Sequence, residues 1–339
     1  MDMETFFTVL YVLINDWYVS DIQASKSRVG HPGKLTDSEV LTLAIASQWR
    51  AGVPWTSERS FVRYMNARGR ELFPNMIQRS AFNRRVRYLI GVIVRLQQLL
   101  ADLLEDEKDI FECVDSLELP AFSNGQQQRQ KSHWLYESTH GRGAHGNWFW
   151  GDFLLTSVTR SGIITGWIIG TAAINDHWLM EGLLSARAGS PGLREPERRR
   201  RGGWQRASPP PVGYMGGWLA AGTDKQRPYL SDKGFGGQRW SDHWSRRYTA
   251  NVITVPQDHA ITQAKWSRAW KLWHAHHRQI VETTFSVLTQ VFDIKHLNAH
   301  SRWGQLTRIV CKMVGYNIGI YLNRLLGRND LQHATLLCW

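Results

Sequence analysis

An apolar series between positions 82 and 103 constrains the fold of this chain most, because its members recur at alternating steps of four and three residues. That spacing places them on one face of a helix that begins at about Ser80. The series consists of Phe82, Val86, Leu89, Ile93, Leu96, Leu100 and Leu103. A narrow apolar stripe of this kind, with no apolar residues beside it, would join two subunits in a coiled coil. Further apolar residues between 90 and 99 widen the face, so we expect a helical bundle within one chain instead.

Other helix signals precede this series. Residues 6–17 are a short apolar stretch, and a third helix is predicted over residues 57–70. Thr36 and Glu39 form a capping box, in which each side chain satisfies a backbone donor at the start of a helix. We therefore expect residues 1–107 to form an all-α region.

The first turns of the predicted helix after Ser80 are strongly basic. Their polar side chains are Arg79, Asn83, Arg84, Arg85 and Arg87. Several short helices that end in an arginine-headed one match the layout of a helix-turn-helix reader of DNA, in which such side chains face phosphates or base edges. The alternative is a basic face that contacts only solvent.

The charge balance of the whole chain points to a polyanionic partner. Lys and Arg number 41 against 29 Asp and Glu, a formal net charge of +12. Nucleic acid is the first candidate partner and an acidic membrane surface the second. No apolar run approaches the roughly 20 residues of a membrane span, and the first residues lack the pattern of a signal peptide. We therefore expect a cytoplasmic protein with no membrane partner, which suits its three scattered cysteines.

After residue 107 the pattern changes, and strand signals alternate with helix signals. The predicted strands are 110–115, 148–158, 163–174, 229–235 and 251–256, the second and third forming a β-hairpin. The predicted helices are 175–184, 277–288 and 306–326. This order predicts an α/β domain over residues 108–326, a mixed sheet flanked by helices, followed by a C-terminal tail at 327–339.

Residues 185–227 differ from their surroundings. They are rich in Gly, Pro and Arg, with four consecutive arginines at 198–201. We predict a basic insertion that is irregular or mobile. Its arginines suit a phosphate backbone, and a solvated linker is the alternative.

Three carboxylates in the second region are the candidate reactive groups. Asp115 and Asp232 each end a strand-like run, and Glu282 lies beside the apolar face of the helix at 277–288. In a mixed sheet with a helix packed on it, the three can meet at one point. Acidic oxygen donors with no nearby Cys or His suit Mg²⁺ or Mn²⁺, and two such ions can activate a water or a 3′-hydroxyl against a phosphodiester. The alternative for Glu282 is an ion pair with Arg278, one turn earlier.

The segments around these carboxylates carry a family resemblance. Val114-Asp115-Ser116, the run from Leu230 to Phe235 and the run from Arg278 to Ser286 resemble the three acidic motifs of DDE-type insertion-sequence transposases. These are bacterial enzymes with an RNase H-like catalytic core. Asn175-Asp176, after the predicted hairpin, resembles a further family segment. The resemblance extends over about residues 35–326, interrupted by the insertion.

The resemblance implies a role for each residue. Asp115 would bridge two Mg²⁺ or Mn²⁺ ions, while Asp232 would ligate one and Glu282 the other. Arg278 would orient Glu282 or contact a phosphate, and Lys233 would lie against the DNA backbone. The implied reaction is nicking at the ends of the element, then 3′-hydroxyl attack on target DNA without a covalent protein intermediate. The implied partners are double-stranded DNA and further copies of the chain, in a dimer or larger assembly at the bacterial nucleoid.

Two other functions are consistent with parts of the sequence. His274-Ala275-His276 resembles the metal site of nucleases that use a tyrosine nucleophile, but that motif belongs on a strand and here it opens a predicted helix. The second alternative is a non-catalytic DNA-binding protein, either a regulator or an inactivated transposase. Such a protein would use the helical region and leave the three carboxylates without a chemical role.

Overall fold

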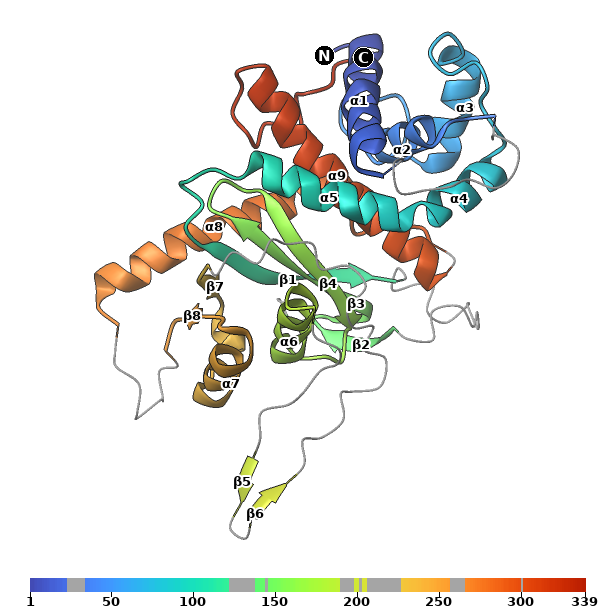
Figure 1. Cartoon of the computed structure of the whole chain (residues 1–339). Helices are drawn as coiled ribbons and strands as arrows, with labels where there is room; N and C mark the ends of the chain where they lie inside the picture. The colour runs from blue at the N-terminus through green and yellow to red at the C-terminus, as the bar shows by residue number, and fades with distance from the viewer. Residues whose placement is uncertain are drawn as a thin grey trace. The chain divides into compact units, whose positions relative to one another are not determined.

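The structure is a computed structural model (Figure 1). It describes residues 1–22, 34–121, 138–143, 146–189, 198–200, 203–205, 227–256, 266–299 and 301–339. The chain divides into two compact units. Unit 1 comprises Met1–Leu100 and Ser286–Trp339, and unit 2 comprises Ala101–Phe285. Unit 1 is helical and unit 2 contains a mixed sheet with helices, so the chain has the mixed α/β composition that the sequence predicts.

The predicted N-terminal helices are present. They are α1 (Met3–Trp17), the π-helical turn η1 (Tyr18–Ile22), α2 (Asp37–Ala46), α3 (Glu58–Arg68), α4 (Arg79–Tyr88) and α5 (Ile90–Leu104). The capping box at the start of α2 is confirmed, because Thr36 Oγ1 accepts the Glu39 N–H at 3.2 Å and the Glu39 carboxylate accepts the Thr36 N–H. Ser57 caps α3 in the same way through the Ser60 N–H.

The single long helix predicted over the apolar series is wrong, because α4 and α5 are separate helices that meet at Leu89. The Leu89 N–H is shared between the carbonyls of Arg85 and Val86, which is the tightened last turn of a helix end. Apart from Leu103, which is 56% exposed, the whole series is buried. The apolar face is therefore covered within the chain, as the bundle interpretation expects.

The last long helix, α9 (Arg302–Leu325), belongs to unit 1. It packs against α2 and α4. At Gly315 a Cβ atom would lie 3.0 Å from the Phe292 ring and 3.2 Å from the Trp49 ring, so a larger residue would require these rings to shift. The division of the chain therefore differs from the predicted domains 1–107 and 108–326, because residues 286–326 pack with the N-terminal helices.

The residues predicted as a tail, 327–339, are a packed part of unit 1. The Met1 ammonium group donates to the Leu336 carbonyl at 2.9 Å. The Trp339 ring lies 4.9 Å from the ring of Trp55, centroid to centroid. Leu336 and Leu337 are buried. Both chain ends thus contribute to the same aromatic core, and Figure 1 shows them side by side.

Unit 2 is built on a six-stranded mixed sheet. Its strands are β1 (Glu112–Pro120), β2 (Thr139–Arg142), β3 (Trp148–Thr159), β4 (Ile164–Thr171), β7 (Tyr229–Ser231) and β8 (Val252–Thr254). The order is β2-β3-β1-β7-β8, and β4 also pairs with β3. β3 and β4 form the predicted hairpin, and β1 is antiparallel to β3. β7 and β8 continue the sheet in parallel to β1. The carboxyl ends of β1's paired segment and β7 therefore face the same edge.

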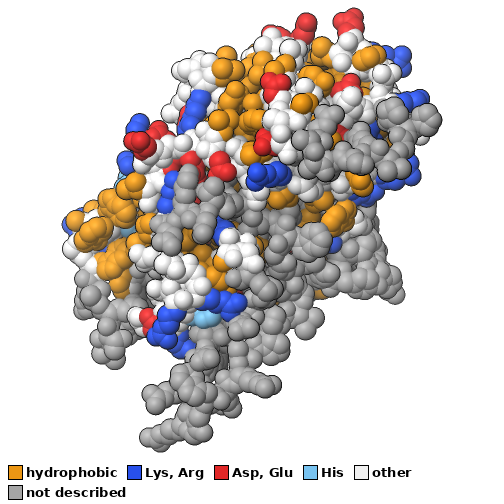
Figure 2. Space-filling view, viewed as in Figure 1, with side chains coloured by type: hydrophobic (Ala, Val, Ile, Leu, Met, Phe, Trp, Pro, Cys, Tyr) orange, Lys and Arg blue, Asp and Glu red, His pale blue; other side chains and the backbone are white. Residues whose placement is uncertain are grey.

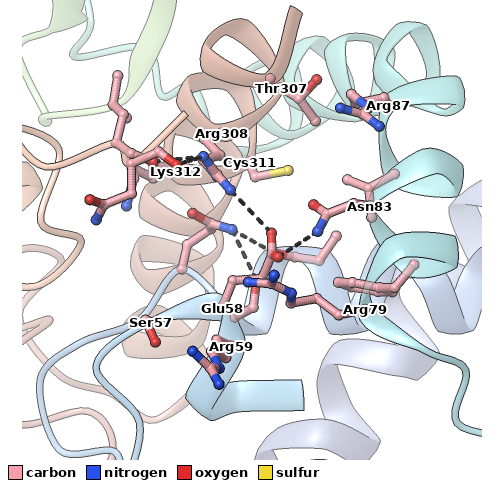
Figure 3. A pocket seen from close by; sticks show the side chains of 18 of the residues that line it. Ser57, Glu58, Arg59, Arg79, Asn83, Arg87, Thr307, Arg308, Cys311 and Lys312 are labelled. Carbon is pink, nitrogen blue, oxygen red and sulfur yellow. Dashed lines mark hydrogen bonds and ion pairs between the residues drawn. The ribbon is translucent and has the colours of Figure 1, made fainter. Parts of the chain in front are cut away.

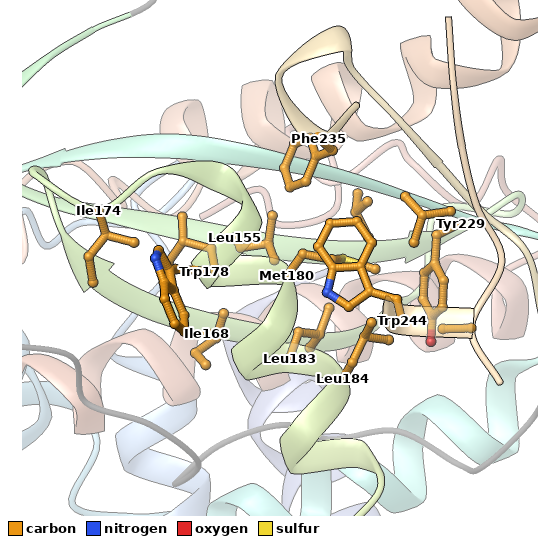
Figure 4. Packing of buried hydrophobic residues seen from close by; sticks show 14 residues of the cluster. Leu155, Ile168, Ile174, Trp178, Met180, Leu183, Leu184, Tyr229, Phe235 and Trp244 are labelled. Carbon is orange, nitrogen blue, oxygen red and sulfur yellow. The ribbon is translucent and has the colours of Figure 1, made fainter. Parts of the chain in front are cut away.

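Two helices, α6 (Asp176–Arg187) and α7 (Gln238–Tyr248), pack with the sheet around an apolar core. Figure 4 shows Leu155 of the sheet, Leu183 of α6 and Trp244 of α7 converging in this core. The buried Trp244 donates its indole N–H to the Glu181 carboxylate at 3.1 Å. The Tyr248 hydroxyl donates to the same carboxylate at 2.6 Å. The acidic group on the core side of α6 is therefore satisfied by α7, as a buried carboxylate must be.

A buried ion pair fixes the start of β1 to the end of α6. Arg187 Nη1 lies 2.7 Å from Glu112 Oε2 and 2.7 Å from the Tyr229 hydroxyl, and Arg187 Nη2 donates to Thr165 at 2.9 Å. Burial by itself would raise the pKa of Glu112, but the Arg187 guanidinium and hydrogen bonds including that from Ser157 hold the pKa below its ordinary value. This network ties together β1, β4, β7 and α6.

A long helix, α8 (Arg268–Gln290), passes over the start of β1. The Cys113 thiol donates to the His277 carbonyl at 3.3 Å. The Phe111 ring contacts the rings of Trp273 and His277 at 5.8 and 5.1 Å between centroids. These contacts set the rotation of α8, and so decide which of its side chains point toward the strand ends.

The predicted insertion at 185–227 begins later than expected, because α6 continues to Arg187. β5 (Arg198–Arg200) and β6 (Gly203–Gln205) pair as a small antiparallel sheet. Residues 190–197, 201–202 and 206–226 of the insertion lie outside the described residues. No helix in the described ranges is long and apolar enough to cross a membrane.

Candidate functional site

Two of the three predicted carboxylates meet at the edge of the sheet. In the parallel pairing of β1 and β7, Val114 is opposite Ser231, so Asp115 and Asp232 are the next residues on two neighbouring strands. Arg278 of α8 joins them. Its Nη2 lies 2.7 Å from Asp115 Oδ2, and its Nη1 lies 3.5 Å from Asp232 Oδ1. We call Asp115, Asp232, Asp176 and Arg278 the acidic site.

Asp176 is the third carboxylate of the acidic site. It is the first residue of α6, which Asn175 caps by accepting the Trp178 N–H. Asp176 Oδ1 accepts a hydrogen bond from the Ser116 hydroxyl at 3.1 Å, so it is tied to the residue that follows Asp115. The helix that packs on the sheet therefore brings an additional acidic group to the two aspartates.

The carboxylates of the acidic site influence one another electrostatically. Burial raises the pKa of Asp115, Arg278 opposes that rise, and the charges of Asp232 and Asp176 add to it. Burial also raises the pKa of Asp176, and Asp232 adds to this rise as well. Asp232 is the more exposed of the bridged pair, with 57% of its side chain accessible against 23% for Asp115. The site therefore brings three acidic groups together, two of which pair with Arg278.

The turn after β7 is shaped to leave room for Asp176. Asp232 is followed by the short 3₁₀ helix η4 (Lys233–Phe235). A Cβ atom on Gly234 would lie 2.6 Å from Asp176 Oδ2, so a larger residue would displace the carboxylate. A His177 ring nitrogen lies 2.9 Å from the Gly236 carbonyl. The turn that carries Asp232 is thus held against the first turn of α6.

Glu282, the third predicted carboxylate, stands apart in this structure. It is exposed on α8, one turn after Arg278, and no hydrogen bond or ion pair connects it to another described residue. Among the described ranges, no group of three or more His, Cys, Asp or Glu side chains is spaced to hold a metal ion. Arg278 pairs with the two aspartates and not with Glu282. The structure therefore does not bear out the simple ion pair considered for Glu282.

The His-hydrophobe-His segment lies within α8, as the sequence predicts. The His274 side chain is buried, with a ring nitrogen 3.3 Å from the Ile253 carbonyl, whereas His276 is exposed. Residues two apart on a helix point to different sides, so the two rings do not share a metal site there. This geometry disfavours the tyrosine-nuclease alternative.

The predicted DNA-contacting residues divide into several groups. Arg79, Asn83, Arg84 and Arg87 line a cavity in unit 1. Arg85 is different: its Nη2 lies 2.6 Å from Asp37 Oδ1, and its Nη1 donates to the Leu35 carbonyl. Arg85 therefore joins α4 to the start of α2, and its contact with DNA stays a prediction. Lys233 is exposed beside Asp232 in unit 2.

Surface charge by itself does not single out either site. On the face shown in Figure 2, lysine and arginine side chains lie in small separate groups among apolar and acidic ones. The sequence prediction also missed several residues of interest. Asp176 was noted in the sequence as part of a supporting motif but not as a member of the site, and Arg59 and Arg308, two basic residues of unit 1, lie far from α4 in sequence. Only the three-dimensional structure shows which residues these side chains lie beside.

A scan of the sequence against models of protein families gives no match, and a search among curated proteins finds no related sequence. The geometry of the acidic site and the motifs around its aspartates therefore carry the functional inference.

Proposed function

We propose that this protein is a DNA transposase of the DDE type, which nicks the ends of its own element and joins the 3′-hydroxyls to target DNA. One observation carries the proposal. Asp115 and Asp232, which the motif resemblance singles out, follow opposite positions on adjacent parallel strands and share Arg278. The antiparallel β4-β3-β1 strands that continue into parallel β7 and β8 are compatible with the implied RNase H-like core.

The chemistry of the acidic site fits a divalent cation. Carboxylate oxygens without Cys or His are hard donors of the kind that Mg²⁺ and Mn²⁺ prefer. The raised pKa of Asp115 and of Asp176 reflects burial and mutual repulsion, which a cation relieves. Asp115 and Asp232 would hold the ions. When bound, two such ions supply an activated water or 3′-hydroxyl and stabilise the leaving oxygen of a phosphodiester.

The remaining residues hold and balance this site. Arg278 pairs with Asp115 and Asp232 in the free protein, and its planar guanidinium is equally suited to a phosphate oxygen of DNA. Ser116 fixes Asp176 next to the pair. Glu282 projects from α8 one turn beyond Arg278, and we keep it as the proposed third ligand because its motif matches the family. Lys233 is placed beside Asp232 to contact the DNA backbone.

A non-catalytic DNA-binding protein is the second candidate. The observation that favours it is the salt bridge itself, because Arg278 already pairs with both aspartates and offsets one of their two negative charges. In that case the acidic site would only stabilise unit 2, and DNA binding would belong to the arginines of unit 1.

A nicking assay separates the two functions. The purified chain is incubated with Mg²⁺ or Mn²⁺ and duplex DNA that carries the sequences flanking its own coding region, and 3′-hydroxyl ends are mapped. We expect nicks at defined positions. The Asp115→Asn and Asp232→Asn variants should each nick about 100-fold more slowly or worse, since metal-based charge stabilisation is worth several kcal/mol and each ~1.4 kcal/mol is about tenfold.

The controls make the result specific. Asp242→Asn changes a carboxylate of unit 2 that accepts a hydrogen bond from Gln238, away from the acidic site, and it should leave the nicking rate unchanged. Glu282→Gln tests the third ligand: a loss as large as that of Asp115→Asn supports its role. A wild-type chain that binds the DNA but never cuts it with either metal ion would establish the non-catalytic alternative.

A further inference from the structure

Unit 1 contains a cavity of about 730 Å³ enclosed by the ends of α2 and α3, by α4 and by α9. We call it the basic pocket (Figure 3). Its cationic lining residues are Arg50, Arg59, Arg79, Arg84, Arg87, Arg308 and Lys312. Among the described residues that line it, Glu58 is the single carboxylate. The pocket therefore gathers charge of one sign around a concave space.

Most of this charge is not balanced from within the protein. Four of the arginines make no hydrogen bond or ion pair with any residue that the structure describes, and they are Arg59, Arg79, Arg84 and Arg87. Arg59, Arg79 and Arg84 are also exposed, so their guanidinium groups are accessible to a ligand. Like charges held close together repel one another, and an anion in the pocket relieves that repulsion.

The start of α4 adds a second feature that points to an anion. Ser57 and Ser301 cap α3 and α9 through their side chains, but Gln78 makes no side-chain hydrogen bond at the start of α4. The first backbone N–H groups of α4 therefore have no side-chain cap, at the end of the helix where the dipole is positive. Arg79 and Ser80, the first residues of α4, line the pocket. An oxyanion there would accept from backbone and guanidinium donors together.

Glu58 holds the walls of the pocket in place. Its Oε1 accepts the Asn83 side-chain N–H at 2.6 Å, and its Oε2 lies 3.6 Å from Arg308 Nη2. Figure 3 shows this carboxylate between the two partners. Arg308 also donates to the Leu297 carbonyl at 3.0 Å. Glu58 thus connects α3 to α4 and α9, and it leaves the remaining arginines without an acidic partner among the described lining residues.

From these observations we infer that the basic pocket binds the sugar-phosphate backbone of DNA, through phosphate contacts from Arg59, Arg79 and Arg84 and from the start of α4. The inference rests on the proposed function for the identity of the polyanion as DNA. It narrows the helix-turn-helix prediction, in which the side chains of the same helix face phosphates or base edges, to contacts with phosphates. Asn83, the side chain best suited to an adenine edge, is engaged with Glu58. Contacts to phosphates position DNA without reading its sequence.

The test measures DNA binding without catalysis. Fluorescence anisotropy follows a labelled duplex of arbitrary sequence, in EDTA, with Asp115→Asn present in every chain so that cutting plays no part. The triple variant Arg59→Ala, Arg79→Ala, Arg84→Ala is compared with the parent over a range of salt concentrations. We expect affinity to fall about tenfold or more. The slope of log K against log salt should become shallower by about 0.9 for each phosphate that the variant no longer neutralises.

Two further variants identify the interaction. Arg68→Ala removes an exposed arginine at the far end of α3 that does not line the pocket, and it should bind as the parent does. Replacing the three arginines by lysine keeps the charge, so the salt slope should stay close to that of the parent. Unchanged thermal melting of every variant shows that the fold is intact.

Three results would overturn the inference. The triple alanine variant could bind DNA with the affinity and salt slope of the parent, which would show that the pocket does not contribute to DNA binding. The loss could be confined to one DNA sequence, which indicates base reading. Inorganic phosphate or pyrophosphate could displace DNA at low millimolar concentration, which indicates a small-anion site. These measurements need no DNA cutting, so a negative nicking assay does not change their interpretation. A negative result for the basic pocket likewise does not count against the proposed role of the acidic site.

Discussion

The acidic site of unit 2 and the basic pocket of unit 1 each concentrate charge of one sign, but they differ in how much of it is paired with an opposite charge. In the acidic site, the single positive charge of Arg278 is shared by Asp115 and Asp232, so a negative excess remains. In the basic pocket, Glu58 is the one carboxylate among the described lining residues, against seven cations. Arg278 pairs with two of the three aspartates before a ligand arrives, whereas four arginines of the pocket have no partner among the described residues. The contrast suggests that one site acts on DNA and the other holds it.

The largest effect is expected where unit 2 depends on its buried ion pair. Arg187→Met leaves Glu112 buried without its partner, which should destabilise the protein by about 3–5 kcal/mol. Urea unfolding followed by tryptophan fluorescence measures the change. Arg160→Met, at the exposed turn between β3 and β4, is the matched control and should cost less than about 0.5 kcal/mol. A loss below about 1 kcal/mol for Arg187→Met would mean that the sheet does not need this network.

A second prediction concerns the shape of the acidic site. Gly234→Ala places a methyl group 2.6 Å from Asp176 Oδ2 and should displace that carboxylate, lowering the nicking rate about tenfold while the protein still folds. Gly91→Ala in α5, where no atom lies within 4 Å of the added methyl, is the control and should leave the nicking rate unchanged. Equal nicking rates for Gly234→Ala and the parent would show that the position of the Asp176 carboxylate does not affect catalysis.

A third prediction tests the excess charge of the basic pocket. The pKa of Lys312 is lowered to about 7; burial is the largest cause, Arg50 and Arg308 also lower it, and Asp293 and Cys311 oppose them. Between pH 7 and the ordinary lysine pKa of 10.5, the unfolded chain binds a proton that the folded one does not, so stability rises with pH over this window.

Lys312→Met removes that proton-binding difference. The variant should be more stable than the parent by about 1 kcal/mol or more at pH 7, although the Phe292 carbonyl loses its donor, and its own stability should rise less between pH 7 and 10.5. Denaturant unfolding at several pH values gives both curves. If the stability of parent and variant changed with pH in the same way, folding would not lower the pKa of Lys312.

The smallest effect is expected from the one acidic residue among the described lining of the pocket. Glu58→Gln keeps an acceptor for Asn83 but removes a negative charge, so DNA affinity at low salt should increase by about two- to threefold. Anisotropy titrations in EDTA measure it. Reduced affinity in a variant with parental melting temperature would mean that Glu58 arranges the arginines more than it opposes the ligand.

The two sites also differ in how far sequence could predict them. Asp115 and Asp232 could be paired in advance, because each ends a strand-like run of sequence, although β1 continues beyond Asp115 to Pro120. Glu282 was placed on the correct helix, but the rotation of α8 brings Arg278 to the aspartates and leaves Glu282 exposed. That rotation depends on contacts such as that of Cys113 with His277, which no helical periodicity contains.

The basic pocket was only partly predictable. The arginines of α4 are visible as a cluster in the sequence. Arg85, however, does not line the pocket, because it lies on the side of α4 that faces α2 and forms an ion pair with Asp37. Arg59 and Arg308 join from other helices, and the single-helix prediction hid the break at Leu89. Concavity is a property of how helices assemble, so the sequence could indicate a basic surface but not a pocket.

The central claim is that Asp115 and Asp232 act as one catalytic pair, and a double-mutant cycle on the nicking rate tests it most directly. Residues that work as a unit lose their function together, so the double variant of Asp115→Asn and Asp232→Asn should be no slower than either single variant. Losses that multiply in the double variant, or a double variant that nicks at the parental rate, would contradict a shared catalytic role.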